Sequence, residues 1–534
     1  MNKTVSNRKF ALTTPLYYVN DVPHIGSAYT TMVADAIARF KRLKGESVFL
    51  ITGTDEHGQK IQRTAEAKQV DPQVHCDKIA ASFADLWEKL NIQYDYFSRT
   101  TAVRHHAIVK EFFGRVWEQG DIYLSQQQGW YCVSCEEFKE ERELLEDGFC
   151  PIHTNKKVEW RDEANYFFRL SKYQQQLEQL YQQKPDFIQP ETRRNEVLSF
   201  VSQGLQDFSI SRLNVDWGFP IPTDDQHTIY VWFDALLGYL TALVEPESEP
   251  TLENALSQWW PIDLHLIGKD ILRFHAVYWP AMLMSAGIEP PGKVFGHGFL
   301  TKDGRKMGKS LGNTIDPFDL VARYGADAIR YYFLKEIELG QDGDFSESRF
   351  VNVLNADLAN DLGNLLNRTL GMAKKYCQGQ IPRLKGVDVP DSNPLKEIGT
   401  QLSNRVTNAY ESLIFNQACE EIFSLVRASN KFIDDQAPWQ LYKQGEQAQV
   451  EQVLYSVLES VRLAAYLLSP IVPNLSSEVY RQLGFTLDFN DQKLVNQIAP
   501  FNAHSQWGNP LPNQGLSKPK PIFARLELPD SSQS

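Results

Sequence analysis

The chain has 534 residues, of which 42% are hydrophobic and 23% are charged, and its formal net charge is −13. This length exceeds what one hydrophobic core supports, so we expect several modules of ordinary globular composition. The negative balance argues against a protein that coats nucleic acid, although local basic patches can still bind phosphates. No apolar run reaches roughly 18 residues and the N-terminus lacks a long apolar segment, which predicts no membrane span, no secretory signal and a cytoplasmic location.

The first segment has the pattern of alternating strands and helices. We expect a strand at 10–12, a turn region at 15–23, a helix from 26 to about 45, a strand at 48–51 and a loop at 53–58. Such alternation predicts a parallel sheet covered by helices. Ligands of these sheets bind beyond the carboxyl ends of the strands.

The rest of the chain divides into two parts of different character. Residues 120–215 interrupt the alternation, which resumes with expected strands at 228–233, 264–268 and 294–296. After about residue 350, long stretches with helical periodicity at 354–375, 402–432 and 450–468 predict a helical bundle. We expect 521–526, in the Pro- and Lys-rich tail, to pack back onto it.

Two short motifs suit phosphate binding. In His24-Ile25-Gly26-Ser27, a glycine at a helix start allows close approach of a ligand, and the helix N-terminus attracts anions. In Lys306-Met307-Gly308-Lys309-Ser310, two lysines in a loop can neutralise a triphosphate. Taken singly, each motif is also compatible with an ordinary turn or a solvated basic loop. Their order, one after the first strand and one after the last, favours a nucleotide site.

This pair resembles the two signature sequences of class I aminoacyl-tRNA synthetases. The surrounding segments are most similar to the methionyl-tRNA synthetase family: 15–20 (PLYYVN), 53–58 (GTDEHG), 231–235 (VWFDA), 268–275 (GKDILRFH) and 437–439 (APW). The chain departs from the family pattern at Ser27, where the first signature usually has a second histidine. It departs again at Gly308, where the second usually has serine.

The resemblance implies an α/β fold with a Rossmann-like parallel-sheet catalytic domain, split by an insertion and followed by a helical anticodon-binding domain. We place the catalytic halves at 1–119 and 216–300, the zinc-knuckle insertion at 120–215, the signature-loop region at 301–352 and the helical domain with its tail at 353–534.

The implied reaction joins L-methionine to ATP with loss of pyrophosphate and then transfers methionine to tRNA(Met). Positioning and charge stabilisation can carry the first step without a covalent enzyme intermediate. The resemblance assigns phosphate binding and catalysis to His24, Lys306 and Lys309. The ATP site also includes Gly26, Ser27, Gly268, Asp270 and Ser310, with Mg²⁺ bound to the triphosphate.

The resemblance also implies a methionine pocket. Asp55 provides the anion for the ammonium group, although an aspartate in a loop can equally cap the backbone. Tyr18, Trp232, Phe274 and His275 wall an apolar slot, and aromatic rings suit a thioether. The hydroxyl of Tyr239 and the backbone amide of Leu16 would face the sulfur. Without the resemblance, core packing would explain each aromatic residue equally well.

Four residues in the insertion have the spacing of a zinc knuckle: Cys132, Cys135, Cys150 and His153. A closed set of three thiolates and one imidazole favours one structural zinc per chain over a catalytic ion. The alternative is a coincidental group of thiols. The insertion is too short for the editing domain of the isoleucine, valine and leucine synthetases, and a cysteinyl-tRNA synthetase would need zinc in its amino-acid pocket.

In the helical part, Asn364 and Arg368 share a helix face and match the family's anticodon-reading helix. Trp439 could stack an unpaired base, although a solvated face and a core anchor explain these residues equally well. Related chains that dimerise often carry an added C-terminal domain, for which this sequence has no room, so we expect a monomer.

Two other functions compete with this hypothesis. A nucleotidylyltransferase of the same signature superfamily would explain the ATP motifs but not the cysteine cluster or the helical end. A non-catalytic tRNA-binding protein derived from a synthetase would be expected to lose the signature lysines or Asp55, which this chain keeps.

Overall fold

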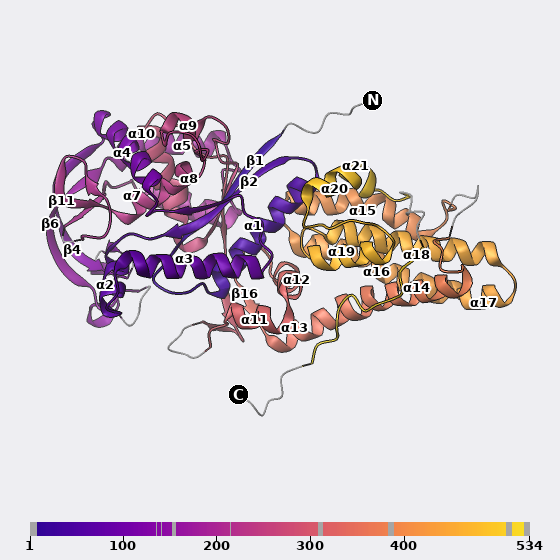
Figure 1. The fold of residues 1–534 in the computed structure, drawn as a ribbon. Coiled ribbons are helices and arrows are strands. Elements are labelled where there is room, and N and C mark those ends of the chain that lie inside the picture. The colour runs from indigo at the N-terminus through magenta and orange to yellow at the C-terminus, as the bar shows by residue number, and fades with distance from the viewer. Residues whose placement is uncertain are drawn as a thin grey trace.

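A computed structural model describes residues 8–134, 136–139, 141–151, 156–213, 215–307, 313–382, 389–508 and 515–527, with the backbone alone for 143 and 306. An α/β domain built on a parallel sheet lies beside an elongated helical domain (Figure 1). Within these ranges, no helix combines the length and the apolar character needed to cross a membrane.

The central sheet has six parallel strands in the order β3-β2-β1-β12-β13-β7, as the alternating pattern predicts. Its strands are β1 (Lys9–Tyr18), β2 (Ser47–Asp55), β3 (Tyr96–Arg99), β7 (Ile188–Gln189), β12 (Leu264–Gly268) and β13 (Val294–His297). The chain order reverses between β1 and β12, so the crevice beyond their carboxyl ends is the expected ligand site.

Three expected boundaries are wrong. The strand at 10–12 extends to Tyr18, and the strand at 48–51 extends to Asp55, because Leu16–Tyr18 pair with Gly53–Asp55. A register shift between Thr13 and Leu16 accommodates Pro15, which has no N–H to donate. The expected strand at 228–233 is half helix, since β11 (Asp224–Ile229) ends there and α7 (Val231–Leu236) begins.

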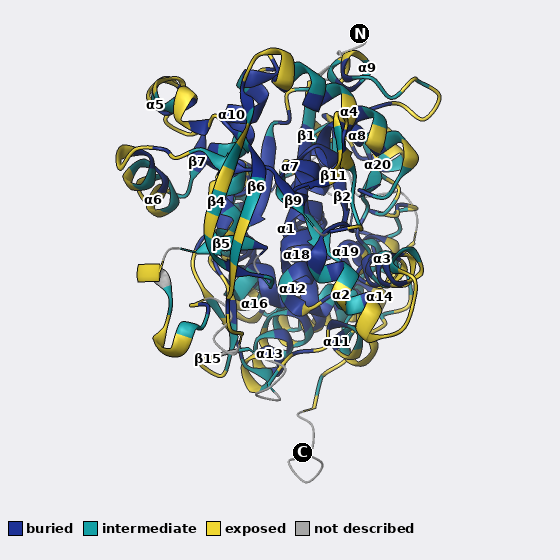
Figure 2. Cartoon of the chain, turned by 90° about the vertical axis from the view of Figure 1, so that its left-hand side faces the viewer, coloured by how far each residue is buried: buried dark blue, intermediate teal, exposed yellow. Residues whose placement is uncertain are grey.

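The sheet has a hydrophobic core on each face. On one face, α1 (Ile25–Leu43) and α3 (Pro72–Lys89) pack in a core that continues into the helical domain. On the other face, α4 (Val103–Glu118), α8 (Gly238–Thr241) and α10 (Trp279–Ser285) share a second core. Helix α1 is buried almost throughout and lies at the centre of the molecule (Figure 2).

The insertion is built on a long antiparallel ribbon of β4 (Ile122–Cys132) and β6 (Glu159–Phe168). Short strands β5 (Glu137–Lys139) and β8 (Phe208–Ser209) complete this sheet. The same segment of chain also provides β7, which forms the edge strand of the central sheet. The remaining described α-helices and β-strands of the α/β part are α2 (Gln59–Ala67), α5 (Gln174–Gln183), α6 (Glu191–Ser202), α9 (Leu252–Leu256), β9 (Ser211–Leu213), β10 (Pro220–Ile221), β14 (Leu300–Lys302), β15 (Arg305–Lys306) and β16 (Gly343–Phe345).

The helical domain confirms the periodic pattern after residue 350. Its helices are α11 (Pro317–Tyr324), α12 (Ala326–Glu336), α13 (Glu347–Leu354), α14 (Leu365–Tyr376), α15 (Pro394–Glu411), α16 (Phe415–Gln436), α17 (Pro438–Lys443), α18 (Gln447–Leu468), α19 (Pro473–Gln482), α20 (Gln492–Ile498) and α21 (Phe501–His504), with a π-helix at Asn355–Asn364. The expected helix at 402–432 is interrupted, because Leu413 has a φ of 59° and turns the chain between α15 and α16. The tail packs back as expected: the side-chain amide of Asn355 donates to Leu526 O and its oxygen accepts from Leu526 N–H.

A buried ionic cluster joins the two domains. Asp35 of α1 accepts from Arg39 Nε at 2.7 Å and pairs with Arg330 of α12 at 2.6 Å, and the three side chains are at most 1% exposed. Arg330 also donates to Ile471 O and Pro470 O, ahead of α19. Opposite charge beside Asp35 lowers the pKa of its carboxyl despite the burial that raises it, so the aspartate stays ionised.

Replacing one member of this cluster should destabilise the fold strongly. In Arg330→Met, two buried carbonyls lose their donor and Asp35 keeps only one arginine, so we expect a loss of about 3 kcal/mol in the free energy of unfolding. The urea midpoint of unfolding measures it. Lys89→Met, which breaks an exposed pair with Asp85, is the control. Equal midpoints for the two variants would contradict the importance of the cluster.

Candidate active site

Helix α1 begins at the predicted phosphate motif, where His24 caps the helix. His24 Nδ1 accepts from the backbone amides of Gly26 and Ser27 at 3.0 and 3.2 Å. The Ser27 hydroxyl accepts from His24 N–H at 3.1 Å and donates to His24 O at 2.7 Å. Because Nδ1 is an acceptor, the neutral ring carries its proton on Nε2, where it can donate to an anion. The Ser27 hydroxyl is thus part of the helix cap.

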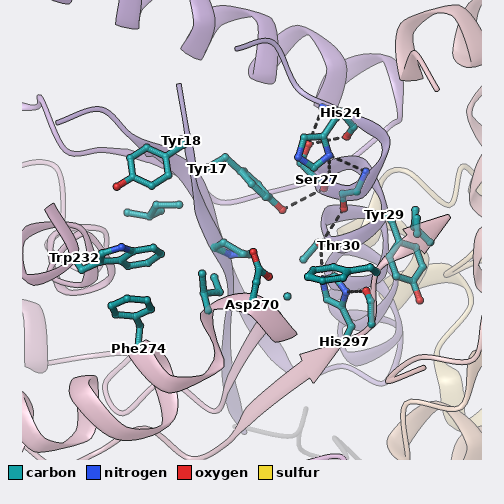
Figure 3. A pocket seen from close by; sticks show the side chains of 18 of the residues that line it. Tyr17, Tyr18, His24, Ser27, Tyr29, Thr30, Trp232, Asp270, Phe274 and His297 are labelled. Carbon is teal, nitrogen blue, oxygen red and sulfur yellow. Dashed lines mark hydrogen bonds between the residues drawn. The ribbon is translucent and has the colours of Figure 1, made fainter. Parts of the chain in front are cut away.

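A cavity of about 390 Å³ lies beyond the carboxyl ends of β1, β12 and β13. It brings together most of the predicted ATP and methionine residues: Leu16, Tyr18, His24, Gly26, Ser27, Trp232, Gly268, Asp270 and Phe274. Figure 3 shows His24 and Ser27 at one end, with Asp270 between them and the other end. That other end is formed by Tyr18, Trp232 and Phe274. The arrangement suits an elongated ligand with an anionic part and an apolar part.

The apolar end is a set of contacting aromatic rings. Trp232 stacks on Phe274 with ring centroids 4.0 Å apart, and Tyr18 meets Trp232 edge-on at 6.1 Å. Tyr239 and His275 are not among the residues that line the cavity. The Tyr239 hydroxyl is hydrogen-bonded to His275 Nε2 at 2.8 Å, and His275 Nδ1 donates to Ile271 O at 3.1 Å. The roles expected for these two side chains stay predictions.

Asp55 lies at the carboxyl end of β2, directly beside Tyr18 of β1. It is 1% exposed, and its Oδ1 has no hydrogen-bond partner among the described residues. Burial raises the pKa of this carboxyl well above its usual range, and the nearby charges of Asp234 and Glu136 raise it further. It does not line the cavity but lies next to it. A buried carboxylate oxygen without a partner is costly unless a cation arrives to pair with it.

A second buried network holds the segments around Asp55. Asp234 of α7 pairs with His57 Nδ1 at 2.6 Å and with His105 Nε2 at 2.9 Å. His105 in turn contacts the Thr241 hydroxyl at 2.7 Å. Burial raises the pKa of Asp234, but the two histidines outweigh burial and hold it at about 2. The network fixes the segment after β2 against the helix that carries Trp232.

The second signature is only partly described. In the hairpin of β14 and β15, the backbone of Lys306 pairs with Thr301. Thr301 directly follows Leu300, which lines the cavity. Met307 packs against the main core. Gly308, Lys309, Ser310 and the side chain of Lys306 lie outside the described residues.

The cavity also contains residues that the sequence analysis did not single out. Lys60 of α2 places its Nζ 5.2 Å from the centre of the Tyr18 ring. Glu137 lines the cavity from the insertion, and His297 lines it from the end of β13. Burial lowers the pKa of His297 to about 4, so the ring is neutral at pH 7. The rule that ligands bind beyond strand ends could have identified His297. No local pattern could have identified Lys60 and Glu137, because they reach the cavity only when distant segments pack together.

The cysteine cluster is also partly described. Cys132 ends β4, and Cys150 lies in the same small buried cluster, packed with Val158. The backbone amide of Cys150 donates to Lys156 O at 3.0 Å. Cys135 and His153 lie outside the described residues, and the remaining chain contains no group of three or more candidate ligands.

The predicted anticodon residues lie on the helical domain. Asn364 and Arg368 are exposed, at the junction of the π-helix and α14. Arg368 pairs with Asp434 at 2.5 Å, near the end of α16. Trp439 is half-buried in α17, which follows α16 directly. The Arg368–Asp434 pair therefore joins α14 to the end of α16, which leads into α17 at the distal end of the domain (Figure 1).

Family models match most of the chain. The model described as "tRNA synthetases class I (M)" matches residues 10–157 and 143–370, and the model "Anticodon-binding domain of tRNA ligase" matches residues 400–513. The first covers the sheet, the insertion and the start of the helical domain, and the second covers α16 to α21.

Full-length relatives and solved structures agree with these models. The chain is 70% identical to a methionine–tRNA ligase of Synechocystis, covering 97% of this chain and 98% of the relative, and 71% identical to one of Nostoc, covering 98% of each. A methionyl-tRNA synthetase of Mycobacterium tuberculosis, solved in complex with methionyl-adenylate, is 42% identical and superposes with a TM-score of 0.89 over 97% of this chain and 100% of that chain. The chain therefore belongs to the methionyl-tRNA synthetase family of class I aminoacyl-tRNA synthetases.

Proposed function

We propose that the chain is a methionine–tRNA ligase that activates methionine with ATP and transfers it to the 3′ end of tRNA(Met). The observation that carries this proposal is one cavity that joins a capped helix N-terminus to an aromatic slot, beside a buried carboxylate whose Oδ1 has no partner among the described residues. Phosphate, thioether and ammonium groups each match one of these three features.

In the first step, a methionine carboxylate oxygen attacks the α-phosphorus of ATP, and the bond to the bridging oxygen breaks to release pyrophosphate. His24 donates from Nε2 to a phosphate oxygen as negative charge develops, and the amides at the start of α1 add their partial positive charge. Lys306 and Lys309 neutralise the remaining phosphate oxygens, with Ser310 beside them. Mg²⁺ accompanies the triphosphate and reduces its charge.

The nucleoside and the amino acid occupy opposite ends of the cavity. Gly26 admits the adenine closely because it has no side chain, while Gly268 and Asp270 meet the ribose hydroxyls. Asp55 pairs with the methionine ammonium. Tyr18, Trp232, Phe274 and His275 wall the thioether slot, and the Tyr239 hydroxyl and the amide of Leu16 lie near the sulfur.

In the second step, a ribose hydroxyl of the terminal tRNA nucleotide attacks the carbonyl carbon of methionyl-adenylate, and AMP leaves. Asn364 and Arg368 would hydrogen-bond anticodon bases, and Trp439 would stack on one. Asn364 and Arg368 are exposed, and the pair of Arg368 with Asp434 brings them to the end of α16, directly before the helix that carries Trp439. This common position supports the role.

We also propose that Cys132, Cys135, Cys150 and His153 hold one structural zinc. The two described thiols are buried in one cluster with Val158, and this donor set suits Zn²⁺ in a site without an open position. Such an ion would stabilise the turn between β4 and β6.

The overall activity is tested by ATP–pyrophosphate exchange with each of the twenty amino acids. We expect exchange with methionine alone, since only its side chain fills an apolar slot lined by polarisable rings. Charging of tRNA(Met) transcripts checks the second step. Exchange with cysteine, or with no amino acid, would contradict the proposal.

The role of Asp55 predicts a pH dependence. Because burial raises the pKa of this carboxyl, it stays protonated in the empty site up to a higher pH than an exposed aspartate does, and raising the pH further ionises it. The KM for methionine should therefore fall as pH rises through this pKa. Asp55→Asn should raise the KM at least about 30-fold, or roughly 2 kcal/mol, and abolish this dependence. An unchanged KM in Asp55→Asn would refute the assignment.

The zinc proposal predicts one equivalent of zinc in the purified, unchelated protein. Cys132→Ser and Cys150→Ser should each lower the zinc content, because a hydroxyl is a poor zinc ligand. Cys377→Ser, in the helical domain, is the matched control and should keep the full equivalent. Metal analysis well below one equivalent in the wild type would count against the knuckle.

A further inference from the structure

Glu136 is the residue through which the insertion reaches the amino-acid end of the cavity. It directly follows Cys135 and is 2% exposed. Its φ of 56° places the backbone in the left-handed region, which a residue with a Cβ rarely adopts. A buried carboxylate on a strained backbone persists only where its surroundings hold it in place.

Two hydrogen bonds to the catalytic domain and one within the insertion hold Glu136. Its Oε2 accepts from the Tyr18 hydroxyl at 2.7 Å, and its Oε1 accepts from the Lys60 amide, at the start of α2, at 2.8 Å. Its backbone oxygen accepts from Arg212 Nη2 at 3.3 Å. Gly58 makes room for this carboxylate, because a Cβ there would lie 2.6 Å from Glu136 Oε1.

The bond to Tyr18 bears directly on the aromatic slot. The Tyr18 ring meets Trp232 edge-on, Trp232 stacks on Phe274, and Asp55 lies beside Tyr18 on the neighbouring strand. Tyr18 lines the cavity and is only partly buried, so packing does not enclose its ring on every side. A charge-assisted hydrogen bond at the far end of the phenol restricts that rotation.

We propose that Glu136 is a positioning residue for methionine, which acts by fixing the Tyr18 ring against Trp232 and so couples the insertion to the amino-acid slot. The proposal rests on the proposed function and adds a residue that the reaction itself does not touch. Glu136 contacts the methionine end alone, so its effect should fall on methionine rather than on ATP.

The experiment measures KM for methionine and for ATP separately in pyrophosphate exchange, with kcat, for Glu136→Gln, Tyr18→Phe and the double variant. Glutamine keeps the volume and can still hydrogen-bond both partners, because the Tyr18 hydroxyl can accept from its amide, but it removes the negative charge and so weakens the bond to Tyr18. We expect the KM for methionine to rise about tenfold in Glu136→Gln, with the KM for ATP changed less than about twofold. The zinc content should equal that of the wild type.

The double variant tests whether Glu136 acts through Tyr18. If it does, the double variant should have about the same KM for methionine as Tyr18→Phe alone, since the contact is already lost. Glu159→Gln is the matched control: this residue is also in the insertion, but it pairs with Arg63 on the surface and should leave both KM values unchanged.

Three results would overturn the inference: an unchanged KM for methionine in Glu136→Gln, equal increases in both KM values, or multiplicative effects in the double variant. If Glu136→Gln does not fold, the selective rise in Tyr18→Phe decides in its place. An active wild type with unaffected variants overturns this inference alone, whereas a wild type without methionine-dependent exchange overturns the proposed function as well.

Discussion

The pairing of Asp35 with Arg39 and Arg330 is the interaction on which the rest of the structure depends. A charge removed from water must be paired, so this cluster allows few alternative positions for α1 relative to α12. Helix α1 then runs from the cluster through the centre of the molecule to its N-terminus at the cavity. The position of His24 relative to the sheet therefore depends on how the helical domain packs against α1.

The parallel sheet supplies the second constraint. Because the strands share a direction, their carboxyl ends bring Tyr18, Asp55, Gly268 and His297 to one edge, although they are separated by up to hundreds of residues in sequence. The surrounding hydrogen-bond networks offset the cost of burying Asp55, whose Oδ1 has no partner among the described residues. Asp234, His57 and His105 hold the adjacent segments so that the carboxylate cannot turn out to solvent.

The insertion contributes to the site as well as interrupting the sheet. Cys132 ends β4 of its ribbon, and Glu136, four residues later, reaches Tyr18. The part of the insertion that carries these residues and the aromatic slot are thus adjacent. Rigid support of this kind is what a small ligand needs, because misplaced contacts cost affinity.

The sequence by itself determined the architecture and the chemistry of the site. Periodicity distinguished the alternating segment from the helical one, and the ordered motifs predicted the family and nine of the residues that line the cavity. Only the tertiary structure decided what each side chain does there. It placed Ser27 in a helix cap, the Tyr239 hydroxyl on His275, and Glu136 against Tyr18. Local patterns carry no information about such contacts, because they form between segments that meet only when the sheet, the insertion and the helices have packed together.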